Sequence, residues 1–200
     1  MLKIKHFSGR RATGRHASMG SSMVELALIL PVLLILVFGV VDFGRALLFN
    51  NIMVNMGREG ANLAARTTSS SPFIIKALTD TAAPLDMSNQ GGMVYIARVQ
   101  GVTVGGTVRA NVIELYRAPA ANTTLVSKVW TCGANSWDTN GATSGKCNLP
   151  AGQNLIPIAN WTLPLADGDE VRVAEVLYHY TPLTGYVMKN AVDLYSATVL

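Results

Sequence analysis

Histidine and cysteine are scarce in this chain of 200 residues, which contains three histidines and two cysteines. His6 and His16 precede the first apolar segment, so His179 is the single histidine in the rest of the sequence. A Ser-His-Asp or Cys-His arrangement would have to use it, yet it lies between two tyrosines in an expected strand, which favours a structural role. The glycine-containing stretch 101–106 lacks the lysine and helix start of a phosphate-binding loop. The sequence therefore predicts no catalytic, metal-ligating or cofactor-binding residue, and we expect a protein that is not an enzyme.

Acidic residues are absent from the first 20 positions, which hold five of the 16 basic residues: Lys3, Lys5, Arg10, Arg11 and Arg15. The net charge of +4 belongs to this segment, because the 11 remaining basic residues stand against 12 acidic ones, a balance of −1. We therefore expect no nucleic-acid partner. Positive charge before the first apolar helix favours a cytoplasmic N-terminus and export of the chain beyond that helix. Residues 1–20 are interpreted as a basic leader.

An apolar run follows the leader, and charged side chains are missing from it. Leu26–Val41 has sixteen positions without a charged or hydrogen-bonding side chain. Counting from Ser21, the run is long enough as a helix to cross a hydrocarbon core of about 30 Å. Glu25 stands near one edge although a carboxylate at the centre of a membrane helix costs about 2.5–3.5 kcal/mol. Pro31 is expected to kink or loosen this helix.

The helix is expected to continue beyond the membrane, because apolar side chains fall on one helical face at Phe49, Ile52, Met56 and Leu63. We assign residues 21–45 to the transmembrane half and residues 46–90 to an amphipathic helix followed by a short second helix. Ser71-Pro72 reads as an N-cap with proline at the first helical position of that second helix.

Residues 91–200 are expected to form an exported β-rich domain, because the apolar pattern changes to a period of two. A long loop is expected at 132–160, and Asp167-Gly168-Asp169 reads as a hairpin turn. The expected strands are 93–99, 102–104, 108–116, 125–131, 161–165, 170–180 and 191–199. A long helix followed by an antiparallel sheet predicts an α+β fold.

The two cysteines, Cys132 and Cys147, fall in the long loop of the exported part, where disulfides persist. Closing about fifteen residues contributes roughly 3 kcal/mol on the chain-entropy model. A metal site is the alternative, but two cysteines with a distant His179 make a poor ligand set. We predict a disulfide, in a loop that contributes few apolar contacts.

The N-terminal motifs resemble a known family. They are GSSMVELALILP at 20–31, FGVVDFGR at 38–45 and GREGA at 57–61. A glycine after a basic leader, with glutamate as the fifth residue after it, resembles the class III signal of type IV pilins. The three motifs in this order resemble the TadE-like family, minor pseudopilins of the tight-adherence (Flp) pilus. Leu26 stands where the major Flp pilin carries tyrosine, so the resemblance is to a minor subunit with a pilin-like fold.

The resemblance implies that a prepilin peptidase cuts between Gly20 and Ser21 and removes the leader. It also implies that Glu25 acts in assembly, by pairing with the new α-amino group of Ser21 on a neighbouring subunit. Within one chain Glu25 lies more than a helical turn away, so we expect the pairing between chains. The implied partners are the prepilin peptidase, other pilin or pseudopilin subunits, the pilus machinery of the inner membrane and the membrane lipid.

The implied location is the bacterial inner membrane, crossed once, with a cytoplasmic N-terminus and a periplasmic C-terminal domain, either retained there or incorporated into the pilus. The alternative is a signal-anchored periplasmic binding module or enzyme of the cell envelope. A plain signal anchor leaves Glu25, and the glycine placed before it, unexplained. A pocket with converging polar groups in the sheet domain would favour this alternative.

Overall fold

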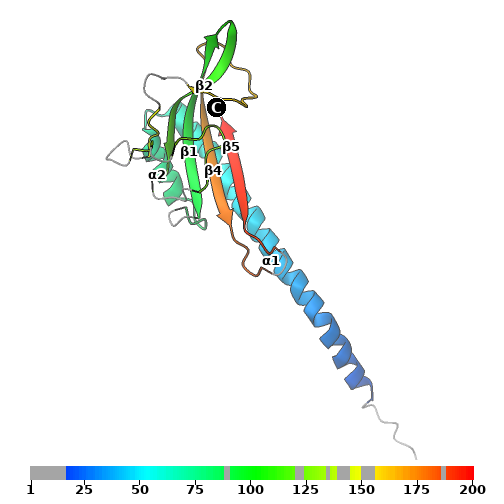
Figure 1. Cartoon of the computed structure of the whole chain (residues 1–200). Helices are drawn as coiled ribbons and strands as arrows, with labels where there is room; N and C mark the ends of the chain where they lie inside the picture. Colours follow the sequence, from blue (N-terminus) through cyan, green and yellow to red (C-terminus); the bar gives the residue numbers. More distant parts are fainter. Residues whose placement is uncertain are drawn as a thin grey trace, which may run out of the picture.

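The protein consists of one long helix and a sheet domain that packs against the C-terminal half of that helix (Figure 1). The computed structural model describes residues 17–87, 91–119, 124–133, 136–138, 145–149, 156–185 and 188–200. The predicted leader therefore lies outside the described residues, apart from positions 17–20, which are helical.

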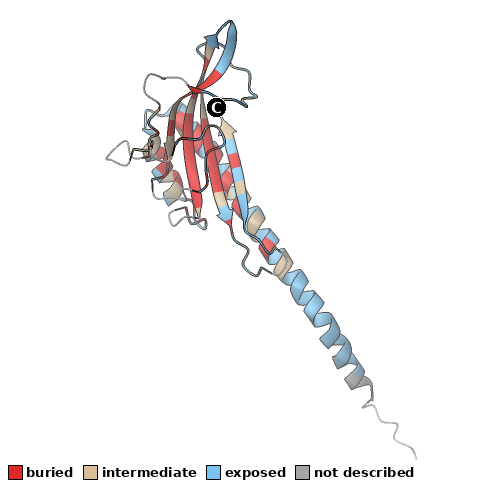
Figure 2. Ribbon diagram, viewed as in Figure 1, coloured by how far each residue is buried: buried red, intermediate tan, exposed pale blue. Residues whose placement is uncertain are grey.

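Helix α1 (Ala17–Arg66) has two halves that differ in environment. Ser21–Leu36 is exposed throughout, and the apolar side chains that follow up to Val41 are exposed or half-buried (Figure 2). Phe49, Met53 and Met56 are buried against the sheet domain, while Ile52 and Leu63 are half-buried. The helical face expected from the sequence is therefore the packed one, with Met53 as a further member. Pro31 lies inside the helix, which continues on both sides of it.

Helix α2 (Ser71–Asp80) follows after four residues and buries Ile74, Ile75 and Leu78. Its N-cap is Ser70, with Pro72 in the first turn, so the predicted cap at Ser71 is one residue too late. The amides of Phe73 and Ile74 both bond to the Ser70 carbonyl, which fixes the start of the helix.

The sheet has five antiparallel strands in the order β3-β2-β1-β4-β5. Their bounds are β1 Gly92–Val104, β2 Thr107–Arg117, β3 Ile156–Pro157, β4 Glu170–Tyr180 and β5 Val192–Val199. The two central strands, β1 and β4, are the most buried, and β4 and β5 lie along α1 (Figures 1 and 2). This is the predicted α+β, pilin-like arrangement.

Two of the predicted strands are wrong. Residues 125–131 and 161–165 form turns and irregular segments, and a short strand, β3, lies inside the expected long loop. Both segments carry β-branched and aromatic residues, but these side chains cover the sheet instead of extending it: Leu125 is part of the core, and Val129, Trp130 and Trp161 pack against it.

The predicted break at Gly101 is also wrong, because β1 runs through it. A Cβ at Gly101 would collide with the Ala166 carbonyl oxygen, so glycine is needed for a close backbone approach, not for a turn. The 167–169 turn consequently docks on β1, with the Gly101 amide bonded to the Asp169 carbonyl and the Gly168 amide to the Gly101 carbonyl, both at 2.9 Å. It does not join two paired strands.

Candidate functional site

The residues predicted from sequence lie in two separate places. Gly20, Ser21 and Glu25 occupy the exposed end of α1, far along the helix from the sheet domain (Figure 1). Ser21 and Glu25 are exposed. Cys132 and Cys147 lie in the sheet domain. The structure therefore contains two regions of interest, joined by the helix.

Helix α1 passes the criteria of length and composition for one membrane span, and none of its most apolar window is buried in the protein. An exposed apolar surface of this length does not persist in water. One long apolar N-terminal helix is consistent with membrane anchoring.

Asp42, the acid that closes the apolar run, is completely buried. One carboxylate oxygen accepts hydrogen bonds from the amides of Leu183 at 2.9 Å and Thr184 at 3.4 Å. The other accepts the Thr184 hydroxyl at 2.5 Å. The backbone carbonyl of Asp42 accepts a hydrogen bond from the Tyr180 hydroxyl at 2.8 Å. The Asp42 clamp, by which we mean Asp42, Tyr180, Leu183 and Thr184, ties the segment after β4 to the helix.

The aromatic residues beside the clamp reinforce it. Phe49, two turns further along α1, makes edge-to-face contacts with Tyr178 and Tyr180, at ring-centre distances of 5.4 and 5.6 Å. Burial raises the pKa of Tyr180, and the negative charge of Asp42 raises it further. The Tyr180 hydroxyl therefore stays protonated and remains a donor.

Sequence reasoning missed the clamp. Asp42 was visible as the residue that ends the uncharged run, but its partners lie 138 to 142 positions away in the chain. The signal that could have found it is the need for hydrogen-bond donors around an acid at this place, together with Tyr180-Thr181-Pro182-Leu183 at the end of β4.

Two glycines let α1 approach the sheet closely. A Cβ at Gly57 would lie 3.2 Å from the Thr198 hydroxyl oxygen, and one at Gly60 would lie 2.7 Å from a methyl carbon of Leu78 and 3.4 Å from the Cβ of Ala174. Arg58 and Glu59, between them, are exposed. The GREGA stretch thus places its small residues against the sheet and α2 and its charges in solvent.

Glu175 is a second buried carboxylate, on the opposite side of the sheet. Ala174 contacts α1, and successive residues of a strand face opposite sides, so Glu175 points away from the helix. It accepts hydrogen bonds from the Ser127 hydroxyl, from the Lys128 amide at 3.0 Å and from the Tyr195 hydroxyl at 2.9 Å. Burial and the Glu175 charge both raise the pKa of Tyr195, which keeps its hydroxyl a donor. Glu175 therefore holds the 127–128 segment against the sheet.

The disulfide between Cys132 and Cys147 is confirmed, with the two Cα atoms 6.1 Å apart. Both cysteines belong to the hydrophobic core, and Trp137 and Leu149 pack against it. The Cys147 amide also bonds to the Leu115 carbonyl of β2 at 2.8 Å. The expectation that this loop contributes few apolar contacts is therefore wrong for its described residues, because Trp137 and Leu149 pack against the core beside the two cysteines.

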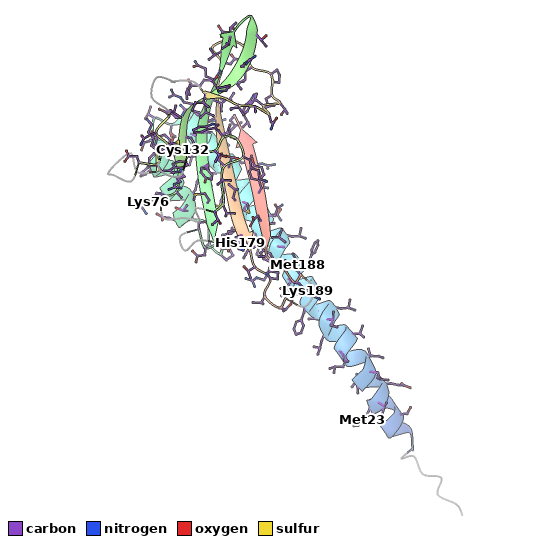
Figure 3. The ribbon with its side chains drawn as sticks, viewed as in Figure 1. Met23, Lys76, Cys132, His179, Met188 and Lys189 are labelled. Carbon is purple, nitrogen blue, oxygen red and sulfur yellow. A yellow bond between two sulfur atoms is a disulfide. The ribbon has the colours of Figure 1, made fainter. Side chains whose placement is uncertain are left out.

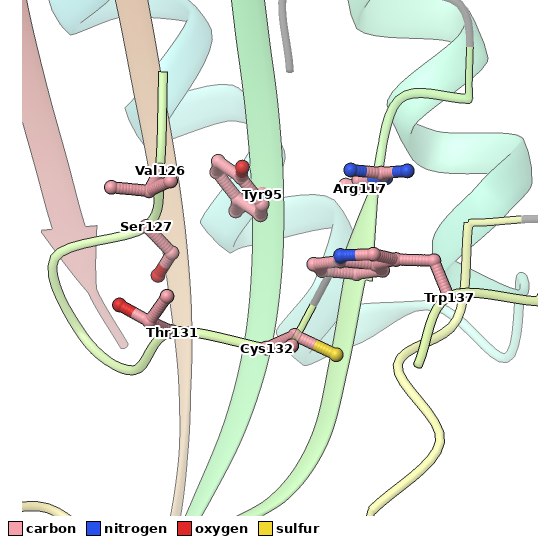
Figure 4. Close-up of a pocket in the computed structure, with 8 residues that line it drawn as sticks. Tyr95, Arg117, Val126, Ser127, Thr131, Cys132 and Trp137 are labelled. Atoms are coloured by element: carbon pink, nitrogen blue, oxygen red, sulfur yellow. The ribbon is translucent and has the colours of Figure 1, made fainter. Parts of the chain in front are cut away.

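A cleft of about 490 Å³ opens beside the disulfide, lined by residues that include Tyr95, Arg117, Ser127 and Trp137 (Figure 4). The Arg117 guanidinium lies 4.3 Å from the centre of the Trp137 ring, and burial lowers the pKa of Arg117. Burial raises the pKa of Tyr95 to about 12, so its hydroxyl donates to the Leu125 carbonyl at 2.7 Å. Each of these polar groups already has a partner within the protein.

The cleft does not hold the elements of a general catalytic centre. The single histidine of the described part, His179, pairs with Asp193 at 2.6 Å on the exposed surface of β4 and β5. Among the described residues, no group of three or more His, Cys, Asp or Glu side chains is placed to hold a metal ion.

Comparison with protein-family models matches residues 20–62 to the family described as TadE-like protein. The match covers 43 of the 200 residues, and over this stretch the chain is similar to TadE-like proteins. TadE-like proteins are in general non-enzymatic components that act in assembly of the Tad pilus. No curated protein and no solved structure is significantly similar to the chain.

The TadE-like stretch coincides with α1 from Gly20 almost to its end. It contains the exposed apolar half, and it supplies the helical side of the contacts with the sheet through Asp42, Phe49, Gly57 and Gly60. The partners of those residues lie outside the matched stretch. The TadE-like part of this chain is therefore one helix with an exposed half and a sheet-binding half.

Proposed function

We propose that this protein is a non-enzymatic minor pilin or pseudopilin that acts in assembly of a tight-adherence (Flp, type IVb) pilus. The observation that carries the proposal is the TadE-like match over α1, whose exposed apolar half is available to lipid and then to neighbouring helices. The proposed location is the bacterial inner membrane, with the N-terminus cytoplasmic and the sheet domain periplasmic.

Processing is the first step of the proposed mechanism. A prepilin peptidase removes residues 1–20 by cutting between Gly20 and Ser21. Glycine at the cut site has no side chain, which leaves room for a close approach of the peptidase to the backbone. The cut creates an α-amino group on Ser21 near the membrane edge.

Charge pairing at Glu25 is the second step. An ionised carboxylate and an ammonium are both costly to remove from water, and each is less costly when paired with the other. Residues four apart share a face of a helix, so the separation of Ser21 and Glu25 does not by itself exclude a pair within one chain, contrary to the reason given for the expectation above. That pair competes with one between neighbouring subunits. Pairing between subunits is the step that would draw a processed chain into a bundle of helices.

The test uses Gly20→Val and Glu25→Leu, produced in cells that make the pilus. Gly20→Val should leave full-length precursor in the membrane, whereas N-terminal sequencing of the wild type should start at Ser21. Glu25→Leu should be cut and inserted, because it removes a charge from the membrane edge, and yet it should fail to co-purify with the pilus machinery. Glu59→Leu, which removes an exposed acid from the same helix outside the apolar half, is the control.

Two outcomes contradict the proposal. A mature start near residue 42, or an intact Met1, would exclude prepilin processing. Assembly of Glu25→Leu at the wild-type level would make Glu25 an incidental residue and favour a plain anchor.

The second candidate, an envelope binding module on a signal anchor, is favoured by one observation, the cleft at Arg117 and Trp137. Arg117→Ala separates the two. A pilus subunit should assemble with or without this side chain. A binding module should lose ligand binding at the cleft, while the protein is still processed and inserted normally.

A further inference from the structure

The segment that connects β4 to β5 is described at residues 181–185 and 188–191, and Leu183 and Thr184 contact α1 at Asp42, where its apolar run ends. Asp42 binds the amides of Leu183 and Thr184 and the hydroxyl of Thr184, so this part of the segment cannot move along the helix without breaking these bonds. Figure 3 shows Met188 and Lys189 at the end of the sheet domain that faces the apolar half of α1. Met188 packs against the core of the domain.

The helix sets the depth of this segment relative to a bilayer. At a rise of about 1.5 Å per residue, Ser21–Val41 spans about 31 Å, which matches a hydrocarbon core of about 30 Å. Asp42 then stands at the boundary between hydrocarbon and headgroups. Leu183, whose amide nitrogen is 2.9 Å from the Asp42 carboxylate, stands at the same boundary.

The side chains of the segment suit that boundary. Leu183 is 65% exposed and therefore does not pack into the domain whose backbone it belongs to. Phe43, the helix residue after Asp42, is 62% exposed. Lys189 is exposed and positively charged. Exposed apolar side chains and a lysine at the same end of the domain suit the headgroup layer, where apolar groups enter the lipid and an ammonium meets phosphate.

We propose that the described parts of this connection, residues 181–185 and 188–191, form a second membrane contact, with Leu183 in the headgroup layer of the bilayer that holds α1 and Lys189 facing lipid phosphates. This inference rests on the membrane anchoring in the proposed function. Its occupant is lipid, because the contact is continuous with the apolar surface of α1. The Asp42 clamp then keeps the sheet domain in contact with the bilayer surface.

The test places an environment-sensitive fluorophore on single cysteines of the full chain in nanodiscs of phosphatidylethanolamine and phosphatidylglycerol. The native cysteines are joined in the disulfide and do not react. Leu183→Cys is the probe. Val104→Cys is the matched control, an exposed apolar residue at the β1–β2 end of the domain, far from the apolar half of α1 (Figure 1). Leu33→Cys reports on the helix itself.

Spin-labelled lipid should quench the probe at 183 severalfold more than the probe at 104, and iodide should do the reverse. Adding Asp42→Ala to Leu183→Cys should lose most of the lipid quenching. Equal iodide access at 183 and 104 would overturn the inference, and so would protection from iodide without quenching by lipid, which indicates a protein neighbour. If the probe at 33 is not quenched by lipid either, the anchoring itself is wrong; if 33 is quenched and 183 is not, this contact alone is wrong.

Discussion

Two buried carboxylates organise the molecule at the scale of single residues. Asp42 and Glu175 are both fully buried, and each accepts hydrogen bonds from segments remote in the sequence. A buried acid is tolerated only where donors replace its lost water. Each carboxylate therefore fixes a remote segment by hydrogen bonds. Asp42 joins the β4–β5 connection to α1. Glu175 joins the 127–128 segment and β5 to the centre of the sheet.

Replacing Asp42 with alanine tests the first of these connections. The Leu183 and Thr184 amides should lose their acceptor, so hydrogen exchange measured by mass spectrometry on peptides covering 181–185 should become faster. Asp42→Asn should retain much of the protection, because its amide can still accept from Leu183 and can donate to the Thr184 hydroxyl. Glu59→Ala on the exposed face of the same helix serves as the control. Unchanged exchange in Asp42→Ala would mean that packing alone holds the segment.

The sequence predicted where these acids stand but not what they bind. Asp42 ends the apolar run, and Glu175 interrupts the alternation of β4, so both were visible as exceptions to a pattern. Their partners come from turns and connections without a periodic signal, and the Ser127 hydroxyl that binds Glu175 lies 48 positions away in the chain. Contacts of this kind follow from tertiary packing, which a local pattern does not encode.

At the scale of elements, the long helix and β4 were predicted most accurately, because each carries a long regular pattern. The 3.6-residue period of Phe49, Ile52 and Met56 predicted the packed face of α1. The errors fall where residues typical of strands cover a sheet, as at 125–131, and where glycine permits a close contact, as at Gly101. Composition is the same in both situations, so only the neighbours decide between them.

The close contact between α1 and the sheet predicts different effects for one substitution at two glycines. Gly60→Leu should lower the free energy of unfolding by about 1–3 kcal/mol, because a leucine there must displace the Leu78 side chain of α2 and press on Ala174 of the sheet, and overpacked cores lose this much. Gly44→Leu should be neutral or slightly stabilising, since no atom lies within 4 Å of its Cβ and leucine favours a helix. Thermal unfolding in detergent, followed by circular dichroism, compares the two. Equal effects would show that the helix is not pressed against the sheet at Gly60.

The disulfide gives a second prediction for an element. Changing Cys132 and Cys147 together to serine should cost about 3 kcal/mol through loop entropy, with an additional loss because both sulfurs are in the core. Loosening should extend to the β2 edge, since the Cys147 amide bonds to Leu115. Dithiothreitol should lower the melting temperature of the wild type and leave the double variant unchanged. A wild type insensitive to reductant would contradict the prediction.

At the scale of the whole molecule, one uninterrupted helix belongs to both the exposed apolar half and the sheet domain. The described chain has no linker between the two: α1 runs from Ala17 to Arg66, and the Asp42 clamp lies where the halves meet. A domain attached in this way cannot turn independently of its anchor. Tilting or rotating the helix in a bilayer or bundle must move the sheet with it.

Because the helix is uninterrupted, the number of residues in its apolar half also fixes the direction in which the sheet projects from it. Each residue turns a helix by about 100°. The number of residues between Glu25 and Asp42 therefore sets the direction of the sheet about the helix axis relative to Glu25. Inserting one alanine after Val37 should swing the sheet by about 100° and block assembly. Inserting four should return it to within about 40° and restore part of the assembly, although the helix is longer. Co-purification with the pilus machinery compares the two insertions. Equal loss in both would show that the length of the helix matters and the direction of the sheet about its axis does not. If the direction matters, the number of residues between Glu25 and Asp42 determines which surface the sheet presents to neighbouring subunits.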